Sequence, residues 1–272
     1  EKRGGFKMWT VLLAILAFRK KVVQPDDTSW LRLGRIAWGI HSFSILAVIG
    51  LIFYIMVSQM YEYQYAWDHV SADLPMKYIF SAFWEGQEGS FLLWMFWHVV
   101  LGSVIIFTAK RWEPGVMTWL SLVQLVLVSM IAGVYFADDF RMGSSPFLLL
   151  RDTMQAPIFN NPNYLTLIEG NGLNPLLQNY WMTIHPPTLF LGFASVTIPF
   201  CFAMTGLWEK DHTAWLKPVM PWTLFSTGIL GLGILMGGAW AYEALSFGGY
   251  WAWDAVENMS LVPWIVLLAA LH

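Results

Sequence analysis

The segment HPPTLFLGFASVTIPFCFAMTGLW, residues 185–208, decides what kind of fold this chain can form. Residues 188–208 contain no charged side chain. A run of that length matches the roughly 20 residues with which an α-helix crosses the ~30 Å hydrocarbon core of a bilayer. Pro186 and Pro187 fit the first turn of such a helix, where a missing N–H group has no helical partner to lose. The segment therefore predicts a membrane-spanning helix with His185 at its mouth.

The rest of the chain repeats this pattern. Four more apolar runs are long enough to span a bilayer and two are shorter: 37–58, 90–109, 115–137 and 219–242, then 6–18 and 259–272. The chain is 57% hydrophobic and 12% charged, against about 25% charged in soluble domains. We predict an all-α fold, a polytopic transmembrane helical bundle with about seven spans. Because the chain begins on Glu and its last apolar run stops at His272, we expect a piece of a longer protein.

Lysine and arginine are distributed unevenly between the predicted connectors. Nine of them lie at residues 19–35, 110–111 and 210–217, whereas the alternate connectors hold Lys77, Arg141 and Arg151. Cytoplasmic connectors carry the excess of Lys and Arg in membrane proteins, which predicts a multi-pass protein of the cytoplasmic (inner) membrane. Lys2, Arg3 and Lys7 depart from this pattern. The connectors 59–89, 138–187 and 243–258 then form an extracytoplasmic working face.

Composition and spacing also divide the chain and exclude some functions. We predict a transmembrane bundle with outer connectors at 1–237, and an aromatic loop with the start of the following span at 238–272. A net charge of -3 without a basic block argues against nucleic acid as a partner. With Cys201 as the only cysteine, the chain has no internal disulfide and no C-x-x-C pair. The Gly233-x-x-x-Gly237 spacing predicts close helix packing.

The stretch GGYWAWDAVENMSLVPW, residues 248–264, is dense in aromatic and acidic side chains. A candidate aromatic platform consists of Trp240, Tyr250, Trp251 and Trp253. Flat indole rings suit a large planar apolar ligand, and a porphyrin is the obvious candidate. Two other interpretations stay open, since Trp and Tyr also anchor helices at membrane interfaces, and Asp254 with Glu257 fits a capping box that opens the last helix.

Two histidines are candidate metal ligands, because neutral imidazole is the commonest protein ligand of haem iron. His185 lies at the outer mouth of a span, where it could instead only cap the helix. His272 lies ~27 Å beyond Asp254 along a helix that rises 1.5 Å per residue, deep in the membrane, where it needs a second ligand or a hydrogen-bond partner. His41 and His98 also lie within spans and are equally compatible with core histidines.

Three stretches of the chain resemble the WWD-domain haem-handling membrane proteins, most closely the haem-lyase type that acts in cytochrome c-type biogenesis. They are FWEGQEGSFLLW (83–94), NPLLQNYWMTIHPPTLFLGF (174–193) and GGYWAWDAVENMSLVPWIVLLAALH (248–272). The chain departs from the family at Ala255, where Pro is usual, and at Tyr250, where Trp or Phe is common. The second change should preserve stacking.

The resemblance implies a platform that holds haem on the outer face between two axial histidines. Its tryptophan and acidic positions are Trp251, Trp253, Asp254 and Glu257, and His185 matches the first outer histidine. The second outer histidine is expected beyond the end of this chain. His272 matches a membrane histidine that shares a separate b-type haem with a histidine from a later span. The expected cofactors are thus two haem b groups, one transferred and one bound in the membrane.

The reaction implied by the resemblance is addition of the two thiols of a C-x-x-C-H segment to the haem vinyl groups. No catalytic residue is expected from this chain, because the thiols belong to the substrate. Implied partners are apocytochrome c, a haem chaperone and other cytochrome c maturation subunits, with quinol as a candidate electron donor. Three alternatives are a WWD-type haem exporter, a b-type membrane electron-transfer protein, and a transporter whose acidic outer loop collects cations.

Overall fold

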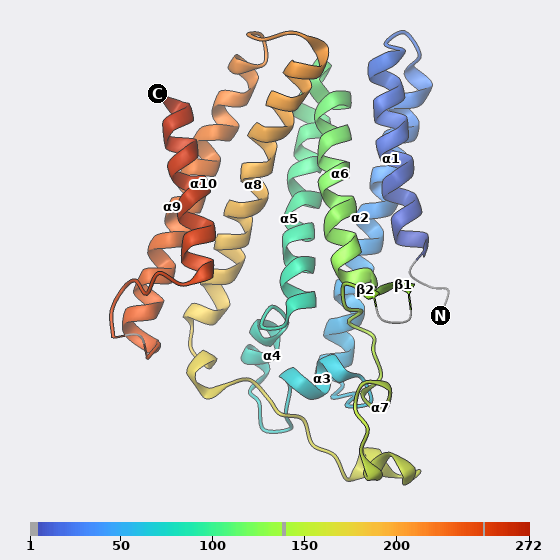
Figure 1. Cartoon of the computed structure of the whole chain (residues 1–272), viewed down its shortest axis with the longest axis vertical. Helices are drawn as coiled ribbons and strands as arrows, with labels where there is room; N and C mark the ends of the chain where they lie inside the picture. The colour runs from blue at the N-terminus through green and yellow to red at the C-terminus, as the bar shows by residue number, and fades with distance from the viewer. Residues whose placement is uncertain (1–4, 138–139, 247) are drawn as a thin grey trace.

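The structure, a computed structural model, describes residues 5–137, 140–246 and 248–272, and most of these residues are helical (Figure 1). The long helices are α1 (Gly5–Val23), α2 (Thr28–Val57), α5 (Gln87–Thr108), α6 (Glu113–Ala132), α8 (Trp181–Glu209), α9 (Leu216–Ala244) and α10 (Ala255–Leu271). The short helices are α3 (Gln64–His69), α4 (Met76–Ala82) and α7 (Leu150–Thr153), with 3-10 turns at Lys110–Trp112, Pro157–Asn160, Tyr164–Thr166 and Pro175–Leu177. The strands β1 (Val134–Ala137) and β2 (Phe140–Met142) pair antiparallel as a small hairpin.

The all-α prediction is confirmed, and the protein is a multi-pass membrane protein. Within the described residues, five helices are long and apolar enough to cross a membrane: α2, α5, α6, α8 and α9. The two shorter predicted segments form α1, which carries several basic residues, and α10, which is a shorter apolar helix. Of the roughly seven spans predicted, five are therefore long and apolar enough among the described residues. The helices α1 and α10 lie beside them as additional long helices.

Two predicted helix ends were wrong. The run 115–137 was expected to be one helix, but α6 ends at Ala132. The next residue, Gly133, caps it with a left-handed φ of 61°, which is easily adopted only by glycine. The span expected to start at the prolines starts instead at Trp181. Pro186 cannot donate to the carbonyl of Met182, yet that carbonyl accepts a 2.7 Å hydrogen bond from the Trp84 indole. The helix can begin earlier because another side chain satisfies the freed acceptor.

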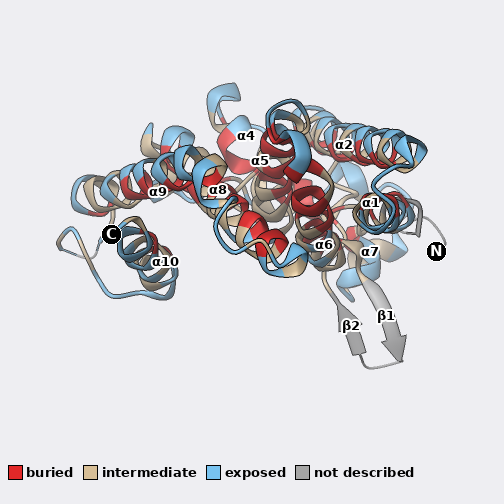
Figure 2. Ribbon diagram, turned by 90° about the horizontal axis from the view of Figure 1, so that it is seen from above, coloured by how far each residue is buried: buried red, intermediate tan, exposed pale blue. Residues whose placement is uncertain are grey.

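The helices stand side by side with alternating direction, and the outer connectors gather at one end of the bundle (Figure 1). Seen from above, buried residues concentrate on α5, α6 and α8, whereas α10 stands at the edge (Figure 2). The opposite end holds the connectors rich in Lys and Arg, and two ion pairs join them. Arg35 of α2 pairs with Glu113 of α6, and Arg111 pairs with Asp211 after α8. The predicted grouping of these connectors is thus confirmed, while Lys2 and Arg3 lie outside the described residues.

The Arg35–Glu113 pair is the strongest polar contact between helices at this end. Arg35 Nε and Nη2 donate to the two carboxylate oxygens of Glu113 at 2.7 and 2.6 Å, a bidentate geometry. The Glu113 side chain is only 3% exposed, whereas that of Arg35 is 47% exposed. Loss of Arg35 would leave a buried carboxylate without its counter-charge, which costs more than loss of an exposed ion pair.

We expect Arg35→Ala to destabilise the protein by about 3 kcal/mol, the lower end of the range for breaking a buried pair. Thermal unfolding in detergent micelles measures this change. Arg32→Ala is the matched control, because Arg32 is exposed on the same helix, and it should shift stability by less than about 1 kcal/mol. Glu113→Gln in the Arg35→Ala background should recover part of the loss. Equal effects of the two arginine variants would contradict the structural role of the pair.

Candidate functional site

The candidate site begins with an unusually close approach of α8 and α9. A Cβ atom added at Gly192 of α8 would lie 2.8 Å from the Cα of Leu230, and one added at Gly233 of α9 would lie 3.0 Å from the Cα of Leu189. Such distances are shorter than ordinary contacts, so the helices touch backbone to backbone only because these positions have no side chain. The close packing predicted from the Gly233 and Gly237 spacing is confirmed.

His185 lies in this contact, at the end of the bundle that holds the outer connectors. A Cβ added at Gly237 would be 2.9 Å from His185 Cε1, so glycine makes room for the imidazole. The ring also lies edge-on to Trp240, with centroids 5.5 Å apart. His185 is 9% exposed, and its Nδ1 atom is buried without a hydrogen-bond partner among the described residues. A buried, unpaired nitrogen of this kind is costly unless a ligand engages it.

A cavity of about 190 Å³ between α8, α9 and α10 brings predicted site residues together. Five of them line it: His185, Trp240, Trp251, Asp254 and Glu257. Gly237 and Gly238 form part of the wall and leave it open. The structure thus joins segments that are about 70 residues apart in the chain, from His185 to Glu257. The other three predicted residues, Tyr250, Trp253 and His272, lie outside this cavity.

The two carboxylates of the loop have backbone partners. Asp254 is the N-cap of α10 and accepts from the Glu257 amide at 2.7 Å, while the Glu257 carboxylate accepts from the amides of Asp254 at 3.2 Å and Ala252 at 2.9 Å. The capping-box interpretation is therefore confirmed, and it coexists with a place in the cavity wall. Trp253, between these groups, has a φ of 59°, which is rare for a bulky residue. The capping bonds hold this unusual loop conformation.

The outward part of the loop presents flat aromatic faces. Tyr250 is 60% exposed and stacks on Tyr242 of α9, with centroids 4.3 Å apart and an interplanar angle of 2°. Trp253 is 69% exposed and meets Trp251 edge-on at 5.7 Å. Trp251 thus belongs to the cavity and also touches the exposed part of the platform. The predicted platform is divided into a buried half and an exposed half.

Two contacts that sequence reasoning missed close the mouth of the α8–α9 contact. The Trp181 indole donates to Glu243 at 2.6 Å, and the Tyr180 hydroxyl lies 3.5 Å from the same oxygen. Partial desolvation and the nearby Glu243 carboxylate raise the pKa of Tyr180. Trp181 precedes His185 by one helical turn, which places both side chains on the same face of α8. This relation was missed from the sequence because the helix was expected to start at the prolines.

The remaining histidines are not brought to this cavity. His272 is exposed at the C-terminal end of α10, whereas His185 lies near the outer end of α8 (Figure 1). His98 is buried, with Nε2 3.1 Å from the hydroxyl of Thr197. His41 is buried, and neither ring nitrogen has a partner among the described residues. These positions do not test the role predicted for His272, which therefore stays a prediction.

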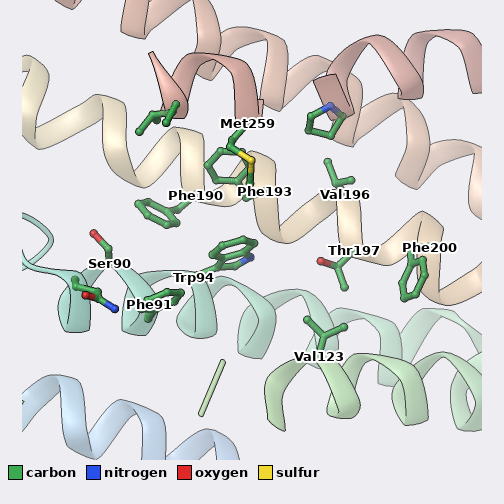
Figure 3. Close-up of a pocket in the computed structure, with 14 residues that line it drawn as sticks. Ser90, Phe91, Trp94, Val123, Phe190, Phe193, Val196, Thr197, Phe200 and Met259 are labelled. Carbon is green, nitrogen blue, oxygen red and sulfur yellow. The ribbon is translucent and has the colours of Figure 1, made fainter. Parts of the chain in front are cut away.

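A larger cavity of about 800 Å³ lies between α5, α6, α8 and α10 and is almost wholly apolar. Phe91 and Trp94 of α5 lie opposite Phe190 and Phe193 of α8 across it (Figure 3). Trp94 approaches the two phenylalanine rings at 6.0 and 5.5 Å between centroids. The volume of this cavity suits a ligand of drug size, but none of the predicted site residues lines the cavity.

Comparison with known proteins decides the family. Residues 84–272 match the family described as "Cytochrome C assembly protein", which covers more than half of the chain and contains the whole candidate site. The chain belongs to this family.

Members of the family with known names are similar over most of the chain. The cytochrome c-type biogenesis protein CcmF of Pseudomonas fluorescens is 34% identical over 252 residues, which cover 91% of this chain and 35% of that protein. CcmF of Escherichia coli (strain K12) is 33% identical over 210 residues, covering 76% of this chain and 30% of that protein. The chain thus spans about a third of the length of the curated relatives it matches. The resemblance to the CcmF-like branch of the family is confirmed.

A solved structure shows the same fold. The protein titled "Cytochrome c Heme Lyase CcmF" matches with a TM-score of 0.76 and 23% sequence identity, covering 99% of this chain and 40% of that one. The helical arrangement described above is therefore a family fold. The roles of individual site residues in this chain stay predictions.

We expect Glu257→Ala to release the aromatic loop, because it removes the acceptor for the Ala252 and Asp254 amides. A lost cap of about 1 kcal/mol corresponds to roughly fivefold faster exchange of these amides. Hydrogen–deuterium exchange of a peptide covering residues 248–258 measures this. Glu257→Gln keeps one acceptor oxygen and should show a smaller increase. Unchanged exchange in the alanine variant would mean that packing, not the cap, holds the loop.

Proposed function

We propose that this protein acts in cytochrome c-type biogenesis, where it presents haem on the extracytoplasmic face for covalent attachment to the C-x-x-C-H segment of apocytochrome c. The observation that carries the proposal is the buried, unpaired Nδ1 of His185 in a cavity walled by Trp240 and Trp251. Family membership supports the same role. The solved structure with the same fold is titled as a haem lyase, and haem lyase is accordingly the class of activity in this proposal.

The residues of the site fit a porphyrin with one protein ligand. The cavity volume of about 190 Å³ is below the ~300–1,000 Å³ of sites that enclose drug-sized ligands. The cavity therefore takes one edge of a larger planar molecule, while the rest lies against the exposed aromatic half of the loop. His185 would supply a nitrogen ligand for the haem iron, and the tryptophans would pack against the apolar porphyrin.

Haem supplies the reactive vinyl groups, and the substrate supplies the thiols. The only cysteine of this chain, Cys201, is fully buried within α8 and so offers no nucleophile to an outer site. The chain's own residues position the ligand, shield it from water, and fix the loop through Asp254 and Glu257. Positioning is the usual contribution of a protein when a cofactor carries the chemistry. No residue is assigned as catalytic.

The finer assignments belong to the same proposal. The basic connectors face the cytoplasm, and the end that holds His185 faces outward. Residues 1–237 form the bundle and residues 238–272 form the haem-handling unit. His272 serves a second, b-type haem within the membrane, with its partner histidine supplied from outside the described chain. Apocytochrome c, a haem chaperone and other maturation subunits are the partners, and quinol is the candidate electron donor.

We expect His185→Ala to abolish haem attachment while the protein still inserts into the membrane, because the change removes a ligand but leaves the backbone contact of α8 and α9 at Gly192 and Gly233. The measurement is the yield of holocytochrome c, together with the haem content of the purified variant. Added imidazole should restore part of both by occupying the vacated ligand position. Normal yields without imidazole would end the ligand assignment.

Three variants control this experiment. His69→Ala removes an outer histidine that is paired with Glu85 at 2.9 Å, and haem content should stay normal. Trp251→Ala should lower haem retention more than Trp253→Ala, because Trp251 lines the cavity and Trp253 does not. If haem content is normal in the His185 variant but none is delivered to apocytochrome c, a haem-exporter role becomes the better interpretation of the site.

We expect His272→Ala to remove a low-spin b-type spectrum while haem can still bind at the outer platform. The reason is distance: a site ~27 Å along α10 from Asp254 cannot share an iron whose axial nitrogens lie within about 2 Å of the metal. An absorption spectrum of the reduced protein, with and without added haem, separates the two populations. Simultaneous loss of both in the His272 variant would mean that one haem site accounts for both histidines.

A further inference from the structure

The end of the bundle opposite His185 contains a second polar site that the proposed function does not use. A cavity of about 720 Å³ lies where the end of α1, the start of α2, the α5–α6 connector and the end of α8 meet. Its polar lining comes from Lys21, Lys110, Arg111 and Glu209, and its apolar lining includes Leu31 and Trp208. Two separate segments, the end of α1 and the α5–α6 connector, thus contribute basic side chains to one cavity.

The basic groups are only partly neutralised. Arg111 is paired with Asp211, whose pKa is lowered by a backbone hydrogen bond from Ala214 and by Arg111 itself. Lys21 donates to the carbonyl of Pro25, a neutral acceptor, so its charge is not cancelled. In the part of the chain that the structure describes, neither Lys21 nor Lys110 forms a salt bridge with a carboxylate. Glu209 also lines the cavity, so the three basic groups are opposed by the carboxylates of Glu209 and Asp211, and one positive charge remains in excess. The cavity therefore favours an anion.

Lys21 is placed differently from its neighbours on α1. Phe18, Ala17 and Ala14 are fully buried and lie three, four and seven residues before it, so they share its helical face. Lys21 therefore projects over the end of the bundle, toward the α5–α6 connector. Lys20 is exposed and does not line the cavity. Either lysine would contribute equally to the excess of positive charge that keeps a connector on the cytoplasmic side. Only Lys21 contributes to the cavity.

An apolar surface continues from the cavity along the membrane side of the bundle. Trp208 in the cavity wall meets Trp119 of α6 edge-on, with centroids 6.1 Å apart. Leu122 and Val126 follow Trp119 at helical spacing and are 41% and 54% exposed. Tryptophan pairs are typical of the headgroup level of a bilayer, and exposed Leu and Val suit the acyl region. From the cavity along α6, the surface therefore presents basic side chains first, then indole rings, and then aliphatic side chains.

We propose that this cavity binds the phosphate-bearing headgroup of an anionic phospholipid, with an acyl chain along Trp119, Leu122 and Val126. Basic pockets between helices on the positively charged side of membrane proteins recognise such headgroups. A free phosphate would use the cations but not the tryptophan and aliphatic groups. Because the site joins α1, α2, α6 and α8, bound lipid stabilises the folded bundle by mass action.

The test compares phosphatidylglycerol with phosphatidylcholine of the same acyl chains, each added to the purified protein in neutral detergent micelles. Native mass spectrometry counts bound lipid, and thermal unfolding reports stabilisation. We expect phosphatidylglycerol to bind at least about tenfold more tightly than phosphatidylcholine and to raise the unfolding temperature. Equal affinity for the two lipids in the unmodified protein would overturn the proposal, whatever the variants do.

Matched variants locate the site. Lys21→Gln combined with Lys110→Gln should reduce the preference for phosphatidylglycerol to nearly that for phosphatidylcholine, whereas Lys20→Gln should leave it unchanged. An equal loss in Lys20→Gln would indicate diffuse surface attraction and would overturn the assignment. Inorganic phosphate is the second arm: a stabilisation equal to that by phosphatidylglycerol would show a free-anion site and would also overturn it. Trp119→Ala should weaken lipid binding without changing the response to phosphate.

Discussion

The close contact between α8 and α9 is the constraint on which the candidate site depends. Glycines at 192 and 233 let two backbones approach within distances that any side chain would prevent. In a bilayer, helix association relies on such packing, because lipid tails are as apolar as the helices themselves. The same contact turns the His185 imidazole against Gly237 and beside Trp240. Helix packing and the placement of His185 are therefore one feature of this protein.

The position of the aromatic loop depends on the α8–α9 contact indirectly, through α10. Trp264 of α10 donates to the Thr227 carbonyl of α9 at 2.9 Å and lies over Gly231, so α10 rests on the same glycine-rich helix. The capping box then fixes how the chain enters α10. This explains how acidic residues can sit among tryptophans beside an apolar cavity: their oxygens accept backbone N–H groups at a helix N-terminus, where negative charge is favoured.

The two ends of the bundle use charge in opposite ways. At the outer end, the carboxylates of Glu243, Asp254 and Glu257 are engaged by indole or backbone donors and hold structure in place. At the basic end, Arg35 holds α2 to α6 through a nearly buried carboxylate, while Lys21 and Lys110 line the cavity without a salt bridge among the described residues. This difference in the use of charge is the basis of the two proposals, a flat apolar ligand at the end that holds His185 and an anionic ligand at the basic end.

The amino-acid sequence alone determined the helical class, the five long spans, the grouping of basic connectors and the capping box, because each follows from local periodicity or from composition along the chain. It could also single out His185 and the tryptophans by residue type. Only the tertiary structure decided that α8 begins at Trp181, since the carbonyl freed by Pro186 is satisfied by Trp84, about 100 residues earlier. It likewise decided that Trp251 faces the His185 cavity while Trp253 faces outward, because that division depends on how α10 packs against α9 and not on the spacing of the two residues.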